Sequence, residues 1–158
     1  MNTESAGIEL IYRRNVKTVW NICITLLRNP ADAEDAVQET FFRLLRSGTV
    51  FSSETHEKSW LIRTAQNVCK NELARARRRE VPLDTQPETG ALPPELDETL
   101  LALRTLPRQY RLALYLHYYE GFSAAELARL LHRPASSVRS DLRRGRTALR
   151  ELLGGDVR

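Results

Sequence analysis

Residues 123–149 read SAAELARLLHRPASSVRSDLRRGRTAL, a stretch with the pattern of two helices joined by a short turn. Ser123 and Glu126 form a capping box that starts a short helix. The chain then turns, and Pro134 suits the first turn of a second, longer helix. The apolar residues of that second helix lie three or four positions apart: Val138, Leu142, Gly145, Leu149 and Leu152. Two helices joined by such a tight turn predict a helix-turn-helix.

The outer face of this second helix is polar and basic. In a helix-turn-helix, the second helix enters the DNA major groove and its N-terminal residues reach the bases. Arginine can read guanine with two hydrogen bonds, and serine can contact bases or phosphates. The expected contacts to a duplex are Ser136, Ser137, Arg139, Ser140, Arg143, Arg144 and Arg146, of which Arg144 and Arg146 suit phosphates or merely solvate the helix. A plain helical hairpin with a basic face is the alternative.

The charge of the chain is strongly uneven along its length. The formal net charge is only +4 over 158 residues. Residues 60–79 nevertheless carry six basic groups and one acidic group, and residues 129–150 carry seven and one. Residues 80–98 between them carry six acidic groups and no basic group. Two basic helices separated by an acidic spacer indicate two separate contacts with anionic partners.

The acidic spacer divides the chain into two domains. Residues 80–96 contain four prolines and one glycine and show no helical periodicity, so they are expected to form a linker. We expect an all-α protein with a three-helix N-terminal domain over residues 1–79. A C-terminal helix-turn-helix domain is expected over residues 97–158.

The N-terminal domain is expected to begin with an amphipathic helix whose apolar residues are Ile8, Tyr12, Val16, Val19, Cys23 and Leu26. Pro30 ends that helix because proline cannot continue the hydrogen-bond ladder. A second helix is expected to start near Asp32, whose carboxylate can cap free N–H groups. Residues 47–58 are expected to form a loop, and residues 59–79 a third helix.

The second helix carries an unusual face. On a helical wheel, Asp35, Gln38, Glu39 and Phe42 fall opposite the apolar side that holds Val37, Phe41 and Leu44. An exposed phenylalanine ringed by carboxylates and an amide suits docking to a protein with a basic surface better than it suits a core. The alternative is that Phe42 packs under the N-terminal segment.

The third helix has a polar side with an aromatic residue in it. The residues off its apolar stripe include Trp60, Arg63, Asn67, Lys70, Arg77 and Arg78. Such residues can stack unpaired bases and neutralise their phosphates, as in single-strand binders. The alternatives are that Trp60 packs over the preceding loop and that the arginine run is a solvated helix end.

The composition argues against several other classes of protein. Hydrophobic residues make up 42% of the chain, enough for a packed core, but no apolar run approaches the length of a membrane helix. Cys23 and Cys69 lie far apart in the sequence with no histidine near either, so no metal-ligand spacing exists and buried reduced thiols are expected. No phosphate loop, serine elbow or HExxH is present. We expect a cytoplasmic protein without membrane insertion, enzymatic activity or cofactor.

Four stretches together resemble bacterial sigma factors. Residues 32–44 (DAEDAVQETFFRL) resemble the helix that binds core RNA polymerase, and residues 60–67 (WLIRTAQN) resemble the promoter-melting helix. Residues 106–111 (LPRQYR) with 121–126 (GFSAAE) look like the start of the second DNA-binding domain, and residues 134–149 are similar to its recognition helix. The short two-domain layout is similar to the extracytoplasmic-function group of the sigma-70 family.

The resemblance implies a promoter-specificity subunit with a role for each face. Asp35, Gln38, Glu39 and Phe42 match the face that binds the clamp helices of the polymerase β′ subunit, and the second domain would meet the β flap. The residues matching positions near the minus-ten element are Trp60, Arg63, Asn67, Lys70, Asn71, Arg77 and Arg78. In the family, the loop before this helix accepts a flipped base, and residues 50–58 correspond to that loop here. The helix from Ser136 to Arg146 corresponds to the reader of the minus-thirty-five element.

The resemblance also implies how such a protein is controlled. The expected partners are core polymerase, promoter DNA and an anti-sigma factor, with the free protein a monomer.

Two other functions fit the residues alone: a dimeric helix-turn-helix regulator with a signal or dimerisation domain, and a helical adaptor that binds proteins only.

Three positions depart from the family pattern. Asn71 stands where the family often has aspartate, and Ala74 stands where it often has arginine. In the recognition helix, Asp141 replaces a usual arginine. This replacement turns a donor into an acceptor, so Asp141 would repel a phosphate or accept a hydrogen bond from cytosine N4.

Overall fold

The protein is all-α over the part of the chain that the computed structural model describes, which is residues 3–27, 29–78 and 98–154. Within these ranges it forms seven helices, which gather into two compact units, α1–α3 and α4–α7. The predicted class of two small helical domains is therefore confirmed. The linker expected at residues 80–96 lies outside the described residues.

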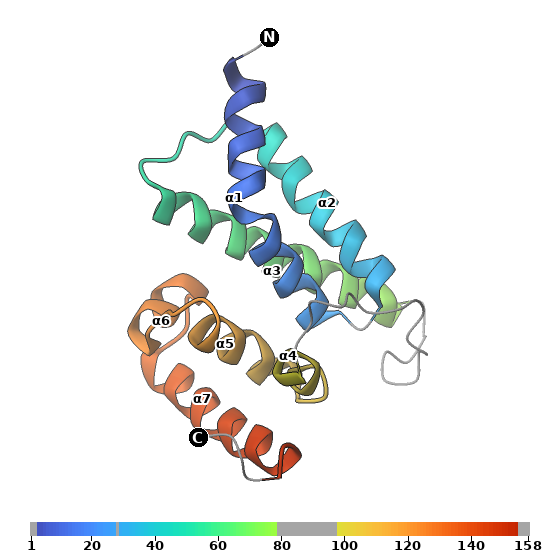
Figure 1. Ribbon diagram of the computed structural model, residues 1–158, viewed down its shortest axis with the longest axis vertical. Helices are drawn as coiled ribbons and strands as arrows, with labels where there is room; N and C mark the ends of the chain where they lie inside the picture. The colour runs from blue at the N-terminus through green and yellow to red at the C-terminus, as the bar shows by residue number, and fades with distance from the viewer. Residues whose placement is uncertain (1–2, 28, 79–97, 155–158) are drawn as a thin grey trace. The chain divides into compact units, whose positions relative to one another are not determined.

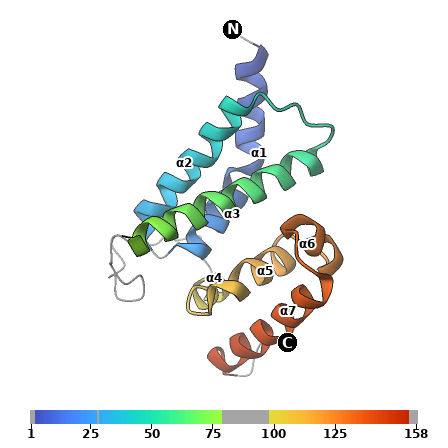
Figure 2. The same ribbon diagram turned by 180° about the vertical axis from the view of Figure 1, so that it is seen from behind.

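The first unit is a bundle of three helices, α1 (Thr3–Leu26), α2 (Pro30–Ser47) and α3 (Glu54–Arg78). Helices α1 and α2 run antiparallel, and α3 crosses them so that its start lies against α1 and its end near the start of α2 (Figures 1 and 2). Apolar side chains from all three helices fill the space between them. The buried core includes Val19, Ile22, Cys23, Ala33, Val37, Phe41, Leu61, Ala65 and Cys69.

Helix α2 begins two residues earlier than expected. Its N-cap is Asn29, whose side-chain oxygen accepts a hydrogen bond of 2.8 Å from the backbone N–H of Ala31. Pro30 occupies the first turn, where its missing N–H costs nothing. The N-cap residue is therefore Asn29 and not Asp32, which lies in the first turn, where its charge complements the helix dipole.

Helix α3 begins five residues earlier than expected, and the preceding loop is correspondingly shorter. The hydroxyl oxygen of Ser53 accepts a hydrogen bond of 3.0 Å from the N–H of His56, and the Ser53 carbonyl accepts one of 3.1 Å from Glu57. Ser53 therefore acts as an N-cap, with two acids in the first turn behind it. The extra helical turn places Glu57 inside α3 instead of in the loop.

The second unit consists of α4 (Glu98–Leu103), α5 (Arg108–Tyr118), α6 (Ala124–Leu131) and α7 (Ala135–Leu152). The capping box of Ser123 and Glu126 is present, as predicted. Helix α7 approaches α5 closely, because a Cβ atom on Gly145 would lie 2.8 Å from Leu114 Cδ1. The fully buried core of this unit includes Leu103, Leu114, Tyr115, Leu116, Leu127 and Val138.

The two cysteines are buried with free thiols, as predicted, but they lie together although they are far apart in sequence. A hydrogen bond with Cys69 and then burial raise the pKa of the Cys23 thiol above its usual range. Such thiols are inert packing groups. None of the described helices is long and apolar enough to cross a membrane.

Candidate nucleic-acid and protein interfaces

Helix α2 exposes the phenylalanine that was expected to dock a partner. The Phe42 side chain is 52% exposed, and the Arg46 guanidinium lies 4.6 Å from its ring centroid. Helix α1 instead places Tyr12 against Phe41, with ring centroids 4.8 Å apart. The alternative in which Phe42 packs under the N-terminal segment is therefore wrong. Leu45, one turn further along, is also exposed and was missed although it lies three residues from Phe42.

The acidic residues beside Phe42 differ in how they are engaged. Glu39 accepts hydrogen bonds from Arg43 at 3.1 Å and from Arg46 at 3.2 Å. Asp35 and Gln38 are exposed on the same side of the helix. The face is thus a mixed patch, in which an aromatic ring is framed by an ion-pair network and by carboxylate and amide groups.

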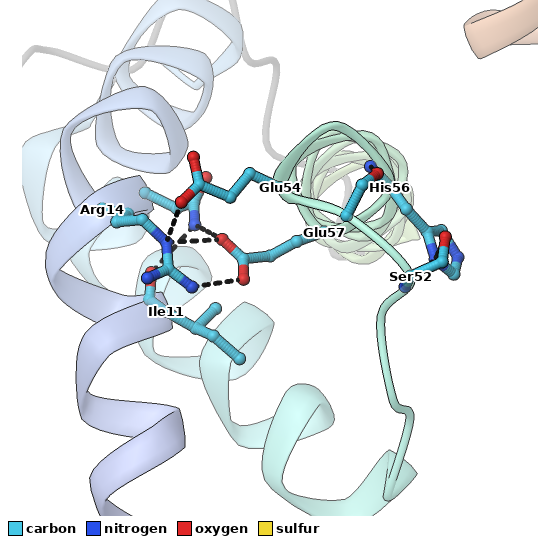
Figure 3. Close-up of polar contacts among 8 residues, drawn as sticks. Ile11, Arg14, Ser52, Glu54, His56 and Glu57 are labelled. Atoms are coloured by element: carbon cyan, nitrogen blue, oxygen red, sulfur yellow. Dashed lines mark hydrogen bonds and ion pairs between the residues drawn. The ribbon is translucent and has the colours of Figure 1, made fainter.

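An ion pair between a surface arginine and a buried acid anchors the start of α3 to α1 (Figure 3). Arg14 donates from Nε to Glu57 Oε2 at 3.1 Å and from Nη2 to Oε1 at 2.7 Å, so the pair is bidentate. Asn15 Nδ2 donates to the same carboxylate at 2.8 Å. The hydrogen bonds from Arg14, then those from Asn15, hold the pKa of Glu57 below its usual value against the opposing effect of burial. Glu57 is only 4% exposed, and its anchoring role was not predicted because residues 47–58 were expected to form a loop.

The loop between α2 and α3 is held by aromatic contacts and by His56. The backbone N–H of Ser52 donates to His56 Nδ1 at 3.1 Å, which folds the loop back on the first turn of α3. The Phe51 ring meets His56 and Trp60 edge to face, at centroid distances of 5.2 and 5.8 Å. Trp60 is half-buried in this contact, which matches the alternative in which it packs over the preceding loop.

The polar residues expected to hold single-stranded DNA form one stripe along α3. Arg63 is half-buried, and the exposed members are Asn67, Lys70, Asn71, Arg77 and Arg78. At its far end, the stripe borders a groove of about 540 Å³ between α2 and α3. The groove is lined by Asn71 and Arg78 together with Asp35 and Glu39, so it joins residues of the two predicted interfaces.

Helix α7 presents most of its predicted DNA-contacting residues to the surface. Ser136, Arg139, Arg143 and Arg144 are exposed, and Ser137 and Ser140 are half-buried. Arg146 differs, because its guanidinium lies 5.9 Å from the ring centroid of Tyr118 on α5 and its Nε atom is buried without a hydrogen bond. Arg146 therefore packs on α5 in addition to carrying charge.

Asp141 does not face the DNA side of α7. It is buried, and its Oδ2 atom accepts a hydrogen bond of 2.6 Å from Nη1 of Arg133 in the turn before the helix. The expectation that it repels a phosphate or reads cytosine is therefore wrong. The helical spacing already indicates that Asp141 is buried, because it follows the core residue Val138 by three positions and so lies on the same face of α7.

Protein-family comparison places both units in one family. The models "Sigma-70 region 2" and "Sigma-70, region 4" match residues 11–79 and residues 96–149. Together they cover the described helices from within α1 to within α7.

Three characterised relatives are similar over most of their length. The ECF RNA polymerase sigma factor SigL of Mycobacterium tuberculosis is 31% identical over 95% of this chain and 90% of that protein. The RNA polymerase sigma factor CarQ of Myxococcus xanthus is 30% identical, over 94% and 90%. The ECF RNA polymerase sigma factor SigW of Bacillus subtilis is 27% identical, over 85% and 82%.

A solved structure has the same fold. The sigma factor RpoE from Bartonella quintana, crystallised with the anti-sigma factor NepR, superposes with a TM-score of 0.77. The two chains are 24% identical, and the match covers 94% of this chain and 97% of the other.

Proposed function

This chain belongs to the extracytoplasmic-function sigma factors of the sigma-70 family, and from that premise we propose how its helices divide the work. A sigma factor is a transcription initiation factor that binds core RNA polymerase and directs it to specific promoters. The first unit would bind the polymerase and hold the melted minus-ten strand. The second would read the minus-thirty-five element and meet the β flap.

The polymerase-binding proposal depends above all on the exposed ring of Phe42. The Phe42 ring is 52% exposed on the side of α2 opposite its packed face, and the exposed Leu45 extends it into a small apolar patch. Aromatic anchors surrounded by polar groups are typical of interface hot spots. We assign Asp35, Gln38, Glu39 and Phe42 to the β′ clamp helices, and add Leu45 because it extends the same apolar surface.

The promoter-binding proposal depends on two basic helices in separate units. On α3, Trp60, Arg63, Asn67, Lys70, Asn71, Arg77 and Arg78 would hold the non-template strand, so that melting follows from capture of unpaired bases. On α7, the residues that would lie in the major groove are the exposed Ser136, Arg139, Arg143 and Arg144 and the half-buried Ser137 and Ser140. No covalent chemistry is needed for either step.

Control of this sigma factor is proposed to come from an anti-sigma factor. The support is that the RpoE relative with the same fold was crystallised in complex with one. We propose that the free protein is a cytoplasmic monomer, because core polymerase is its partner there. Gel filtration tests the monomer, which a dimer peak would contradict.

Promoter-directed transcription tests the whole function. Core polymerase is incubated with genomic fragments, with and without this protein, and transcripts are mapped to their start sites. We expect transcripts that depend on the added protein and share sequence elements upstream of their starts. No stimulation on any fragment would overturn the proposed function.

Substitution of Phe42 tests the polymerase-binding face. Phe42→Ala should weaken binding to core polymerase by about 2 kcal/mol, roughly thirtyfold in Kd, and leave the unfolding curve unchanged. Leu10→Ala is the matched control, because Leu10 is an exposed apolar residue on α1 outside the proposed face. Fluorescence anisotropy with labelled protein gives both affinities. Equal affinities for the two variants would remove Phe42 from the interface.

A further inference from the structure

The turn between α6 and α7 holds an arginine that no sequence pattern singled out. Arg133 donates from Nη1 to Asp141 Oδ2 at 2.6 Å. The two side chains are unequally exposed: that of Asp141 is 10% exposed and that of Arg133 is 37% exposed. The acid is thus inside the unit and the guanidinium is at its surface.

The pair accounts for the single acid in a strongly basic stretch. Residues 129–150 contain seven arginines and one acid, which is Asp141. An exposed carboxylate among them would oppose binding to a polyanion. Buried beneath Arg133, it is kept away from any approaching phosphate and fixes the position of a guanidinium.

Arg133 keeps donors available beyond this pair. A guanidinium has five N–H donors in a planar fork, and the bond to Asp141 uses one of them. A guanidinium that is already held in place loses less side-chain entropy when it binds a phosphate. Its position in the turn that precedes α7 is beside the end of the helix that would enter the major groove.

We propose that Arg133 binds a backbone phosphate of the promoter duplex and that Asp141 positions it for that contact. The inference rests on the proposed function of α7. It adds a phosphate contact outside the helix, and it makes Asp141 a positioning residue that touches no DNA. A purely structural role for the pair would predict a loss of stability without a change in the number of phosphate contacts.

The salt dependence of DNA binding separates these two roles. The full chain is titrated onto a fluorescent random-sequence duplex of about 30 base pairs over a series of KCl concentrations. The slope of log K against log salt concentration is negative, and each phosphate contact makes it steeper by about 0.9. Arg133→Ala should make that slope shallower by about 1, and Arg133→Lys should restore most of its steepness. Arg13→Ala is the matched control, since it removes the same charge from an exposed residue of α1 and should leave the slope unchanged.

A double-mutant cycle tests the positioning role. Asp141→Asn should weaken binding by about three- to tenfold in the wild-type background, and should have no effect in the Arg133→Ala background. A gain in affinity from Asp141→Asn would overturn the positioning role, because it would mean that the acid only repels DNA. An unchanged slope for Arg133→Ala, with wild type binding normally, would overturn the phosphate contact. Absence of salt-dependent binding by wild type would instead overturn the proposed function of α7.

Discussion

The two connections that precede the proposed DNA-binding helices are built alike but anchored differently. Residues 48–53 lead into α3, and residues 132–134 lead into α7. Each connection starts with a residue in the left-handed region, Gly48 at φ 63° and His132 at φ 54°. Each is also fixed by an arginine paired with a buried acid.

The anchors differ in the distance along the chain that they span. Arg14 and Glu57 are 43 residues apart and join two helices with two hydrogen bonds, and Asn15 adds a third. Arg133 and Asp141 are eight residues apart and join a turn to its own helix with one. The start of α3 therefore depends on the tertiary structure of its unit, whereas the start of α7 is organised locally.

Breaking the anchor of α3 should have the largest effect. Glu57→Ala should lower the free energy of unfolding of the first unit by about 2 to 3 kcal/mol. The loss should stay below that of a fully buried pair because Arg14 is 40% exposed and can regain water. Tryptophan fluorescence during urea unfolding measures it, since both tryptophans, Trp20 and Trp60, lie in this unit.

The neighbouring acid provides the control for this variant. Glu54 Oε1 lies 3.9 Å from Arg14 Nε and the side chain is largely exposed. Glu54→Ala should change the free energy of unfolding by less than about 0.5 kcal/mol. Equal losses for the two variants would mean that burial of Glu57 adds nothing, and the contrast between the two connections would fail.

The same anchor should make the first unit sensitive to acid. Hydrogen bonds from Arg14 and Asn15 hold the pKa of Glu57 below its ordinary value of 4.5. A carboxylate with a lowered pKa in the folded state stabilises fully above pH 4.5, and this contribution is lost as the pH falls through the folded value. Wild type should lose stability over that window faster than Glu57→Gln does. Parallel curves from urea unfolding at successive pH values would contradict the assignment.

The local character of the second connection explains why the sequence predicted it so well. The capping box and the three- and four-residue spacing of α7 are both short-range signals, and they placed α6 and α7 almost to the residue. The burial of Asp141 also follows from this pattern, because it lies three positions after the core residue Val138. Exposure of Phe42 followed from the helical wheel alone.

The first connection could not be predicted in this way. The pairing of Arg14 with Glu57 depends on how α1 is rotated against α3, and no local pattern specifies that rotation. The same holds for the meeting of Cys23 with Cys69 and for the groove that Asp35 shares with Arg78. The start of α3 was a different kind of error, because Ser53 followed by two acids is a visible N-cap signal.

The left-handed residues at the start of each connection give the smallest expected effects. Gly48→Ala should lower the free energy of unfolding of the first unit by about 1 kcal/mol, because a Cβ there meets no atom within 4 Å and only the backbone conformation is penalised.

His132→Gly should have the opposite effect and stabilise the second unit by about 0.5 kcal/mol, since relief of the left-handed penalty exceeds the added entropy of the unfolded chain. Hydrogen exchange of α7 amides measures that gain, with His132→Ala as the control that keeps the strain. If both His132→Gly and His132→Ala speed the exchange of the α7 amides to the same extent, the imidazole itself holds the turn. The two connections would then differ in their first residue as well as in their anchors.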